Sequence, residues 1–291
     1  LVDKFITQTE LNGDPIHYGR ALAMKGEVYG RLGEYDKAFE AHRRLEMIYD
    51  ADLHSVLVCK AYGSDRVAQS FGHSARWHMQ QGNSEEALRT CLYVVNTLMP
   101  KMEARNVHNA CVMLWPGLWV MKDMGLASEA RKHFDELVVQ KFSEHYADGA
   151  TTWALAAYTP TLMLLDLCRN QGDQSERIDE YTAWALDKKN LEINSSLNGG
   201  LANFSRDVDS INAEICLLLT RVTEETDIKK RLVENGIYVA QLSMERTRPK
   251  GSSKGMIAAR QQISPVYEEL KGMADGFRAA GRAVRGEFRV G

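Results

Sequence analysis

Few residues of this chain stand at spacings that could support catalysis or bind a cofactor. The segment Gly251–Gly255 holds glycine, serine and lysine together, but it lacks the GxxxxGK[ST] spacing of a phosphate-binding loop, and no strand is predicted before it. His73 and His78 lie five residues apart, whereas two zinc-binding histidines on one helical face lie about four apart. The many acidic residues form no pattern that separates a general-acid pair from a charged helix surface. We therefore predict a protein that is not an enzyme and that has no cofactor or metal site.

The basic residues near the end of the sequence could instead bind an anionic partner. Residues 246–291 hold ten lysines and arginines against four acidic residues, although the whole chain has a net charge of −3. A basic loop at the start of this region contains Arg246, Arg248, Lys250 and Lys254. This loop is either solvated or a contact for an acidic partner, a phosphorylated protein or nucleic acid, of which nucleic acid is disfavoured.

The composition indicates an all-α protein without a membrane span. Apolar residues make up 44% of the chain and charged residues 26%, only 6 residues are proline, and runs of Val, Ile and Thr are scarce. No apolar run reaches the ~18 residues that a membrane-spanning helix needs. The five cysteines include no CxxC pair, which favours reduced, mostly buried thiols and predicts an intracellular, cytoplasmic protein. Because the sequence starts at Leu1, we expect it to be part of a longer polypeptide.

The helices are predicted to form pairs, most clearly within residues 19–50. The first helix contains Gly26 and Tyr29, a turn follows at Gly33, and the second helix begins near Tyr35 and contains Ala38. The small residues allow the two helices to approach closely, while the aromatic residues fill the space beside them. Gly33 suits the left-handed conformation that ends a helix. In these five positions the segment resembles a tetratricopeptide repeat (TPR). The resemblance implies an α-α superhelix, a right-handed solenoid of antiparallel helix pairs that binds other proteins.

Three further segments repeat this pattern with less detail: 71–100, 109–139 and 153–186. The turn glycines Gly33, Gly82, Gly125 and Gly172 are separated by 49, 43 and 47 residues, whereas a TPR unit has about 34. In the last segment, Arg177 replaces the small residue of the second helix, which indicates a looser or imperfect pair. HEAT-type helix pairs, with a period of about 40–47 residues, remain an alternative.

The C-terminal third departs from this pattern. Apolar stripes predict helices over 204–222 and 227–244, which form a fifth pair covering the open end of the array, as solenoids require. A last helix is predicted over 266–288, ordered only where it packs against another surface, because its glycines weaken it. Pro116 and Pro160 predict breaks in the helices that contain them. The predicted organisation is TPR-like pairs over 1–190, an additional pair over 191–245, and a basic loop with a helix over 246–291.

The resemblance also implies that a partner binds to a concave face formed by the first helix of each pair. The residues that the turn glycines place on this face are Arg20, Glu27, Arg31, Gln69, Arg76, Gln80, Trp115, Trp119, Lys122, Asp166, Arg169 and Asn170. Trp115 and Trp119 lie four residues apart, so they either anchor a partner or pack inside their own helix. The family's clamp for a peptide carboxylate is absent, because Ala23 and Glu27 occupy its positions in the first pair.

Three functions follow from these patterns. The favoured one is a protein–protein interaction scaffold or adaptor that binds another protein or a peptide segment, including further domains of the same polypeptide. The second is a regulatory or sensor segment of a larger signalling ATPase, cyclase or transcription regulator. The third is a helical repeat that binds nucleic acid through its basic C-terminal region.

Overall fold

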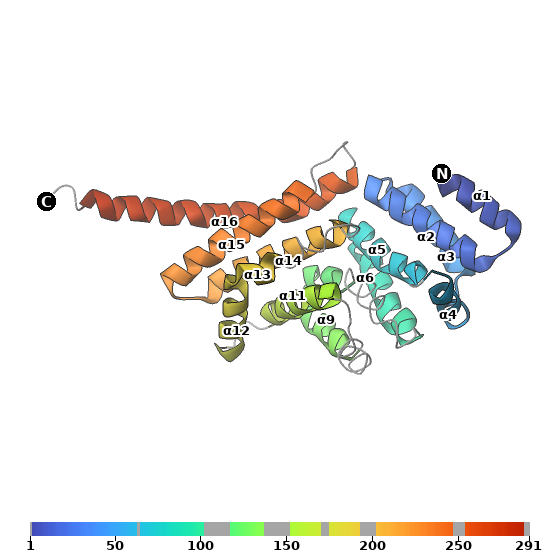
Figure 1. Ribbon diagram of the computed structural model, residues 1–291, viewed down its shortest axis with the longest axis horizontal. Helices are drawn as coiled ribbons and strands as arrows, with labels where there is room; N and C mark the ends of the chain where they lie inside the picture. Colours follow the sequence, from blue (N-terminus) through green and yellow to red (C-terminus); the bar gives the residue numbers. More distant parts are fainter. Residues whose placement is uncertain are drawn as a thin grey trace. The chain divides into compact units, whose positions relative to one another are not determined.

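The computed structural model describes residues 2–62, 65–101, 117–136, 152–169, 175–192, 202–246 and 254–287. Within these ranges the chain is helical and contains no strand, so the predicted all-α class is confirmed (Figure 1). The chain divides into two compact units: unit 1 comprises residues 1–155 and 251–256, and unit 2 comprises residues 156–250 and 257–291. None of the described helices is long and apolar enough to cross a membrane.

Unit 1 is a succession of helices, and tight turns join several of them. In order, they are α1 (Val2–Asn12), α2 (Pro15–Leu32), α3 (Tyr35–Ile48), α4 (Ala51–Tyr62), α5 (Arg66–Gln80), α6 (Ser84–Tyr93), the π-helical turn η1 (Val94–Leu98), α7 (Met99–Lys101) and α9 (Ala127–Phe134). Helix α2 packs against α3, and α5 packs against both α6 and α2. The helix pairs predicted within 19–50 and 71–100 are therefore present as α2–α3 and α5–α6.

Four helices of unit 1 end at a glycine in the left-handed conformation, and three of these glycines are turn residues that the sequence predicts. Gly33, Gly82 and Gly125 have φ angles of 74°, 79° and 78°. After each glycine, the N–H of the next residue donates to the carbonyl five residues earlier, as Glu34 does to Tyr29 at 2.9 Å. This hydrogen bond defines a Schellman turn. The predicted turns at these three glycines are thus confirmed, whereas Gly172 lies outside the described residues.

Two further glycines allow aromatic rings to approach the backbone of α2. A Cβ atom on Gly26 would lie 2.6 Å from Cδ2 of His42 on α3, and a Cβ atom on Gly30 would overlap the ring of Trp77 on α5. His42 and Trp77 themselves pack edge to face, with ring centroids 5.3 Å apart. Gly26 therefore has the close-packing role predicted for it, and Gly30 has the same role toward α5.

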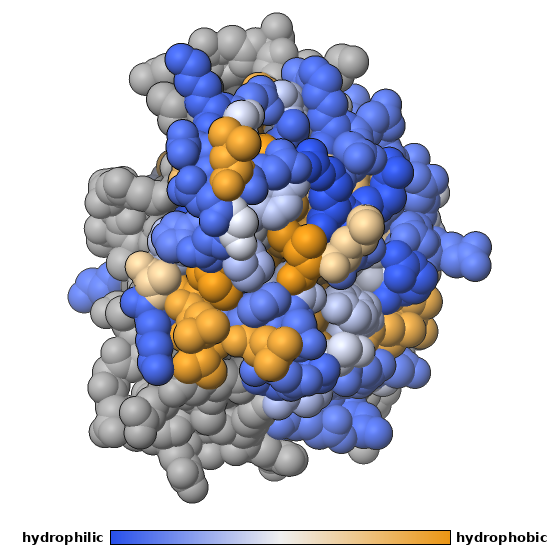
Figure 2. Space-filling model, turned by 90° about the vertical axis from the view of Figure 1, so that its right-hand side faces the viewer, coloured by the Kyte–Doolittle hydropathy of each residue, from blue (hydrophilic) through white to orange (hydrophobic). Residues whose placement is uncertain are grey.

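Helix α4 has apolar residues on both of its faces. It packs against α2 and α5, and it buries Val58, whereas Leu53, Val56 and Leu57 remain 66%, 40% and 48% exposed. Figure 2 shows such apolar groups lying between hydrophilic ones at the surface. The repeat pattern does not predict this helix, yet α4 brings Tyr62, at its last turn, against α2.

A buried carboxylate fixes the start of α5. Asp65 caps this helix by accepting a hydrogen bond from the N–H of Ala68 at 2.9 Å, and its second oxygen accepts one from the hydroxyl of Tyr49. Asp65 is fully buried, and Tyr49 is nearly so. Burial and the neighbouring Asp65 raise the pKa of Tyr49 well above its ordinary value. The tyrosine therefore stays neutral and remains a donor to the cap.

Replacing Tyr49 by phenylalanine should lower the free energy of unfolding by about 1–3 kcal/mol, because the buried Asp65 then loses one of its hydrogen-bond donors. Urea unfolding followed by circular dichroism measures this change. Tyr29→Phe is the matched control: the Tyr29 ring lies beside Lys25 and Lys37, and its hydroxyl forms no hydrogen bond among the described residues. Equal losses in the two variants would contradict the assigned role of the Tyr49 hydroxyl.

Unit 2 is built around two long helices. Its elements are most of α11 (Thr152–Arg169), α12 (Ser175–Leu186), α13 (Lys188–Glu192), α14 (Ala202–Val222), α15 (Thr226–Arg246) and most of α16 (Lys254–Glu287). Helices α14 and α15 pack together, which confirms the pair predicted over 204–222 and 227–244. Helix α12 packs against both of them, so this pair does not stand apart from the residues before 190. The boundary between the two units lies at 155/156 instead.

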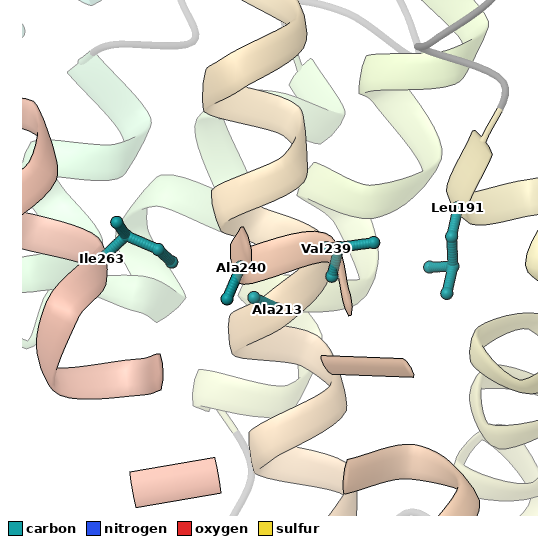
Figure 3. Packing of buried hydrophobic residues seen from close by; sticks show 5 residues of the cluster. All are labelled: Leu191, Ala213, Val239, Ala240 and Ile263. Atoms are coloured by element: carbon teal, nitrogen blue, oxygen red, sulfur yellow. The ribbon is translucent and has the colours of Figure 1, made fainter. Parts of the chain in front are cut away.

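The core of unit 2 continues from this pair onto α13 and α16. One cluster joins Leu191 of α13, Ala213 of α14, Val239 and Ala240 of α15, and Ile263 of α16 (Figure 3). The small side chains of Ala213 and Ala240 leave room for the larger ones around them. This burial explains why α16 forms despite its glycines, as the sequence predicts for a helix that packs against another surface.

Two predicted helix boundaries at prolines are wrong. Pro160 lies inside α11, where a break was expected, and α16 starts at Lys254 and continues through Pro265, although its predicted start is residue 266. An internal proline removes one backbone hydrogen bond. On α16 the apolar residues Ile263 and Leu270, which flank the proline, are both buried against α14 and α15 and offset that loss. Pro116 lies outside the described residues.

Candidate partner-binding face

The predicted face residues of α2 differ in their access to solvent. Arg20 is half-buried, Glu27 has a side chain only 14% exposed, and Arg31 has one 59% exposed. Glu27 and Arg31 are paired with each other, with 3.6 Å between carboxylate oxygen and guanidinium nitrogen. Arg31 is thus the most open of the three predicted residues.

The predicted face residues of α5 are mostly turned to the inside of unit 1. Gln69 and Arg76 are 6% and 9% exposed, and Gln80 accepts a hydrogen bond from the hydroxyl of Tyr35 at 2.9 Å. Helix α5 packs against α2, α3, α4, α6 and η1, so few of its positions face solvent. Gln69 and Arg76 therefore do not line an open surface, which corrects the prediction for them.

Trp119 links α5 to the next helix, which spans residues 117–123. The guanidinium carbon of Arg76 lies 4.6 Å from the Trp119 ring centroid, and Nζ of Lys122 lies 6.0 Å from it. The Lys122 side chain is 6% exposed and is paired with Asp123 at 2.8 Å. Cations over an indole face are attracted by the ring's quadrupole. The structure thus uses Trp119 and Lys122 in internal packing, while Trp115 lies outside the described residues.

Asp166 is a structural residue rather than a face residue. It is completely buried in unit 2, and its Oδ2 accepts hydrogen bonds from Nη1 of Arg177 at 2.9 Å and from the hydroxyl of Tyr181 at 2.7 Å. Burial first, and then Asp166, raise the pKa of Tyr181 to about 12. Arg177, which replaces the expected small residue, thus has a role of its own in joining α12 to α11. Asn170 and the side chain of Arg169 lie outside the described residues.

Two of the four predicted basic residues lie at the ends of described helices. Arg246 is the last residue of α15 and Lys254 the first of α16, whereas Arg248 and Lys250 lie outside the described residues. The segment Gly251–Gly255 also fits the Gly-x-Ser-x-Gly pattern of a nucleophile elbow, which requires a strand before the serine. The element that precedes this segment is the helix α15.

Two of the described cysteines and one histidine are buried, whereas Cys59 and Cys168 are partly exposed. Cys91 and Cys216 have no exposed surface, and burial raises the pKa of each thiol to about 12. His42 is also buried, and both of its ring nitrogens have no hydrogen-bond partner. Within the described ranges, no three His, Cys, Asp or Glu side chains lie close enough together to hold a metal ion.

An arrangement that the sequence pattern does not reveal lies where α2, α4 and α5 meet. The guanidinium carbon of Arg20 lies 5.9 Å from the ring centroid of Tyr62 on α4, and the ring of His17 packs against the same tyrosine at 5.6 Å. Arg66, on the first turn of α5, adds a second positive charge that acts on Arg20. Only Arg20 among these residues belongs to the predicted face, because Tyr62 and Arg66 lie between the two recognisable pairs in the sequence.

Comparisons with known proteins assign no family to the chain. No protein-family model matches it, and neither a curated protein nor a solved structure does so. The TPR resemblance of residues 19–50 therefore depends on the residues themselves and on their packing.

Proposed function

We propose that this chain is a non-catalytic interaction module, whose TPR-like helix pairs hold a segment of another protein against the first helices of the pairs. The observation that carries this proposal is the contact between successive first helices, α2 and α5, together with the Schellman turns that end them at Gly33 and Gly82. Such stacking is how helical-repeat proteins build an extended binding surface.

The exposed residues of α2 are the best candidates for contact with this partner. Arg31 lies at the end of α2, is largely exposed, and is followed by Leu32, which is 41% exposed. An exposed guanidinium beside an apolar side chain is common in protein interfaces, where arginine is enriched. The partner-binding surface thus centres on Arg31 rather than on the buried Gln69 and Arg76.

Site-specific photo-crosslinking tests this proposal. A photoreactive amino acid replaces Arg31 in the full chain, which is then illuminated in an extract of the cells that produce it. The matched control has the same amino acid at Arg43 of α3, because Arg43 is similarly exposed and is also paired with a glutamate on its own helix. We expect one protein to crosslink reproducibly from position 31 and not from position 43. Equal crosslinking from both positions, or none from either, contradicts the proposal.

A further inference from the structure

One face of α4 is apolar and exposed. Leu53, Val56 and Leu57 are 66%, 40% and 48% exposed, and they follow one another at helical spacing, so they share this face. The other side of the helix packs against α2 and α5 and buries Ser55 and Val58. A single exposed apolar residue is ordinary, whereas several adjoining ones on one helix mark a surface that binds another protein.

Opposite charges stand at the two ends of this face. Asp52, Val56 and Lys60 are spaced four residues apart and form one row along α4, with the apolar residue midway between the two charges. Lys60 is exposed and forms no ion pair with any residue that the structure describes. Asp52 is paired with Lys101 at 2.8 Å, but only through Oδ2, and its side chain is 60% exposed. Its carboxylate therefore has room for a second cation.

A second row beside the first is self-complementary in size. Leu53, Leu57 and Ala61 are also spaced four residues apart, and all three are exposed. The row thus has a large side chain at one end, a small one at the other and Leu57 midway. When a copy of the helix is turned end for end, its Ala61 lies opposite Leu53, and the two Leu57 side chains meet. Large side chains that face small ones are what closely packed helices require.

We propose that this face of α4 binds the same face of a second copy of the chain, as an antiparallel pair of helices related by a two-fold axis. Such an axis requires every contact to occur twice, with the two residues exchanged between the copies. Each Lys60 then lies beside Asp52 of the second copy, and Val56 and Leu57 lie near the axis. A helix from another protein would need the same charges and apolar residues in this order, and α4 already has them.

Sedimentation velocity of the full chain, from about 10 µM to about 1 mM, tests whether the dimer forms. One short helix gives a small interface, below the ~1,200 Å² of stable complexes, so the association is weak. We expect the sedimentation coefficient to rise with concentration toward that of a dimer. Leu57→Asp should prevent this rise, whereas Val222→Asp, at a side chain of similar exposure in unit 2, should not. A chain that stays monomeric throughout overturns the proposal and leaves the face to a different protein.

Two charge reversals test the antiparallel arrangement. Asp52→Lys and Lys60→Glu each place like charges opposite each other at both ends of the pair, so either variant alone should dimerise about ten-fold more weakly than the parent. An equal mixture of the two variants has opposite charges at both ends again and should dimerise as the parent does. Asp52→Lys also loses its pair with Lys101, and recovery in the mixture separates lost docking from lost folding. Variants that dimerise like the parent, or a mixture as weak as its components, overturn the proposal.

Discussion

Alanine in place of Gly30 is expected to lower the free energy of unfolding by about 3 kcal/mol, at the upper end of the usual range for overpacking. The added methyl group overlaps the Trp77 ring, and that ring has little room to retreat because it is 6% exposed and packs edge-on against His42. Separating α2 from α5 is the remaining way to make space. Urea unfolding followed by circular dichroism measures the loss.

A glycine-to-alanine substitution on α16 should instead raise the free energy of unfolding. Gly272 is exposed, and a Cβ atom there meets no other atom within 4 Å. Gly272→Ala should therefore raise the free energy of unfolding by about 0.5–1 kcal/mol, since alanine is the better helix former. In addition, Trp77→Leu should rescue part of the Gly30→Ala loss, because a smaller side chain removes the overlap. If the double variant loses the sum of the two single losses, the assigned overlap is wrong.

Acid should destabilise unit 1 through His42. Burial is the main reason why the pKa of His42 falls to about 3, and the neighbouring His73 and His78 lower it further. The folded chain thus keeps His42 neutral, whereas in the unfolded chain it takes up a proton below a pH of about 6.5. The stability that His42 contributes is complete above this pH and falls as the pH is lowered toward 3. At pH 5 the free energy of unfolding is about 2 kcal/mol lower on account of His42 than at neutral pH.

The variant His42→Leu isolates this contribution. Other groups titrate over the same range, so the quantity to measure is the difference between the unfolding free energies of the parent and the variant from pH 7.5 to 4.5. We expect the difference to shift in favour of the variant by about 2 kcal/mol between pH 7 and 5. At pH 7 the variant should be at least as stable, because it removes two buried nitrogens that lack hydrogen bonds. A difference that does not change with pH excludes a neutral, buried His42.

The fold was predictable from the sequence where local and tertiary preferences agree. Gly33, Gly82 and Gly125 end helices because each adopts a left-handed conformation that other residues avoid, and this preference is visible in the sequence. The sequence pattern does not predict helix α4, because its apolar residues lie on both faces and form no one-sided stripe. The sequence also does not predict that α11 continues through Pro160, because it does not show how the packing of a helix offsets a lost hydrogen bond.

The candidate site was predictable only in part. A position on the first helix of a pair can be counted from the turn glycine, and Arg20 and Arg31 were identified in this way. Whether that position is exposed depends on how many helices surround it, and α5 is surrounded on nearly all sides. For this reason Gln69 and Arg76 are buried. Tyr62 comes beside Arg20 only through a tertiary contact, for which no spacing in the sequence gives a signal.

The π-helical turn η1 has a consequence for how the helix pairs of this chain can be compared with one another. In a π turn each carbonyl accepts from the residue five positions ahead, so the turn accommodates one residue more than a regular α-helical turn. Val94, Val95 and Leu98 are all buried there, which means that the extra residue is absorbed without moving an apolar side chain into solvent. An alignment of the helix pairs without gaps loses register by one residue after position 94. The extra residue thus lengthens the spacing between Gly82 and Gly125 without exposing an apolar side chain.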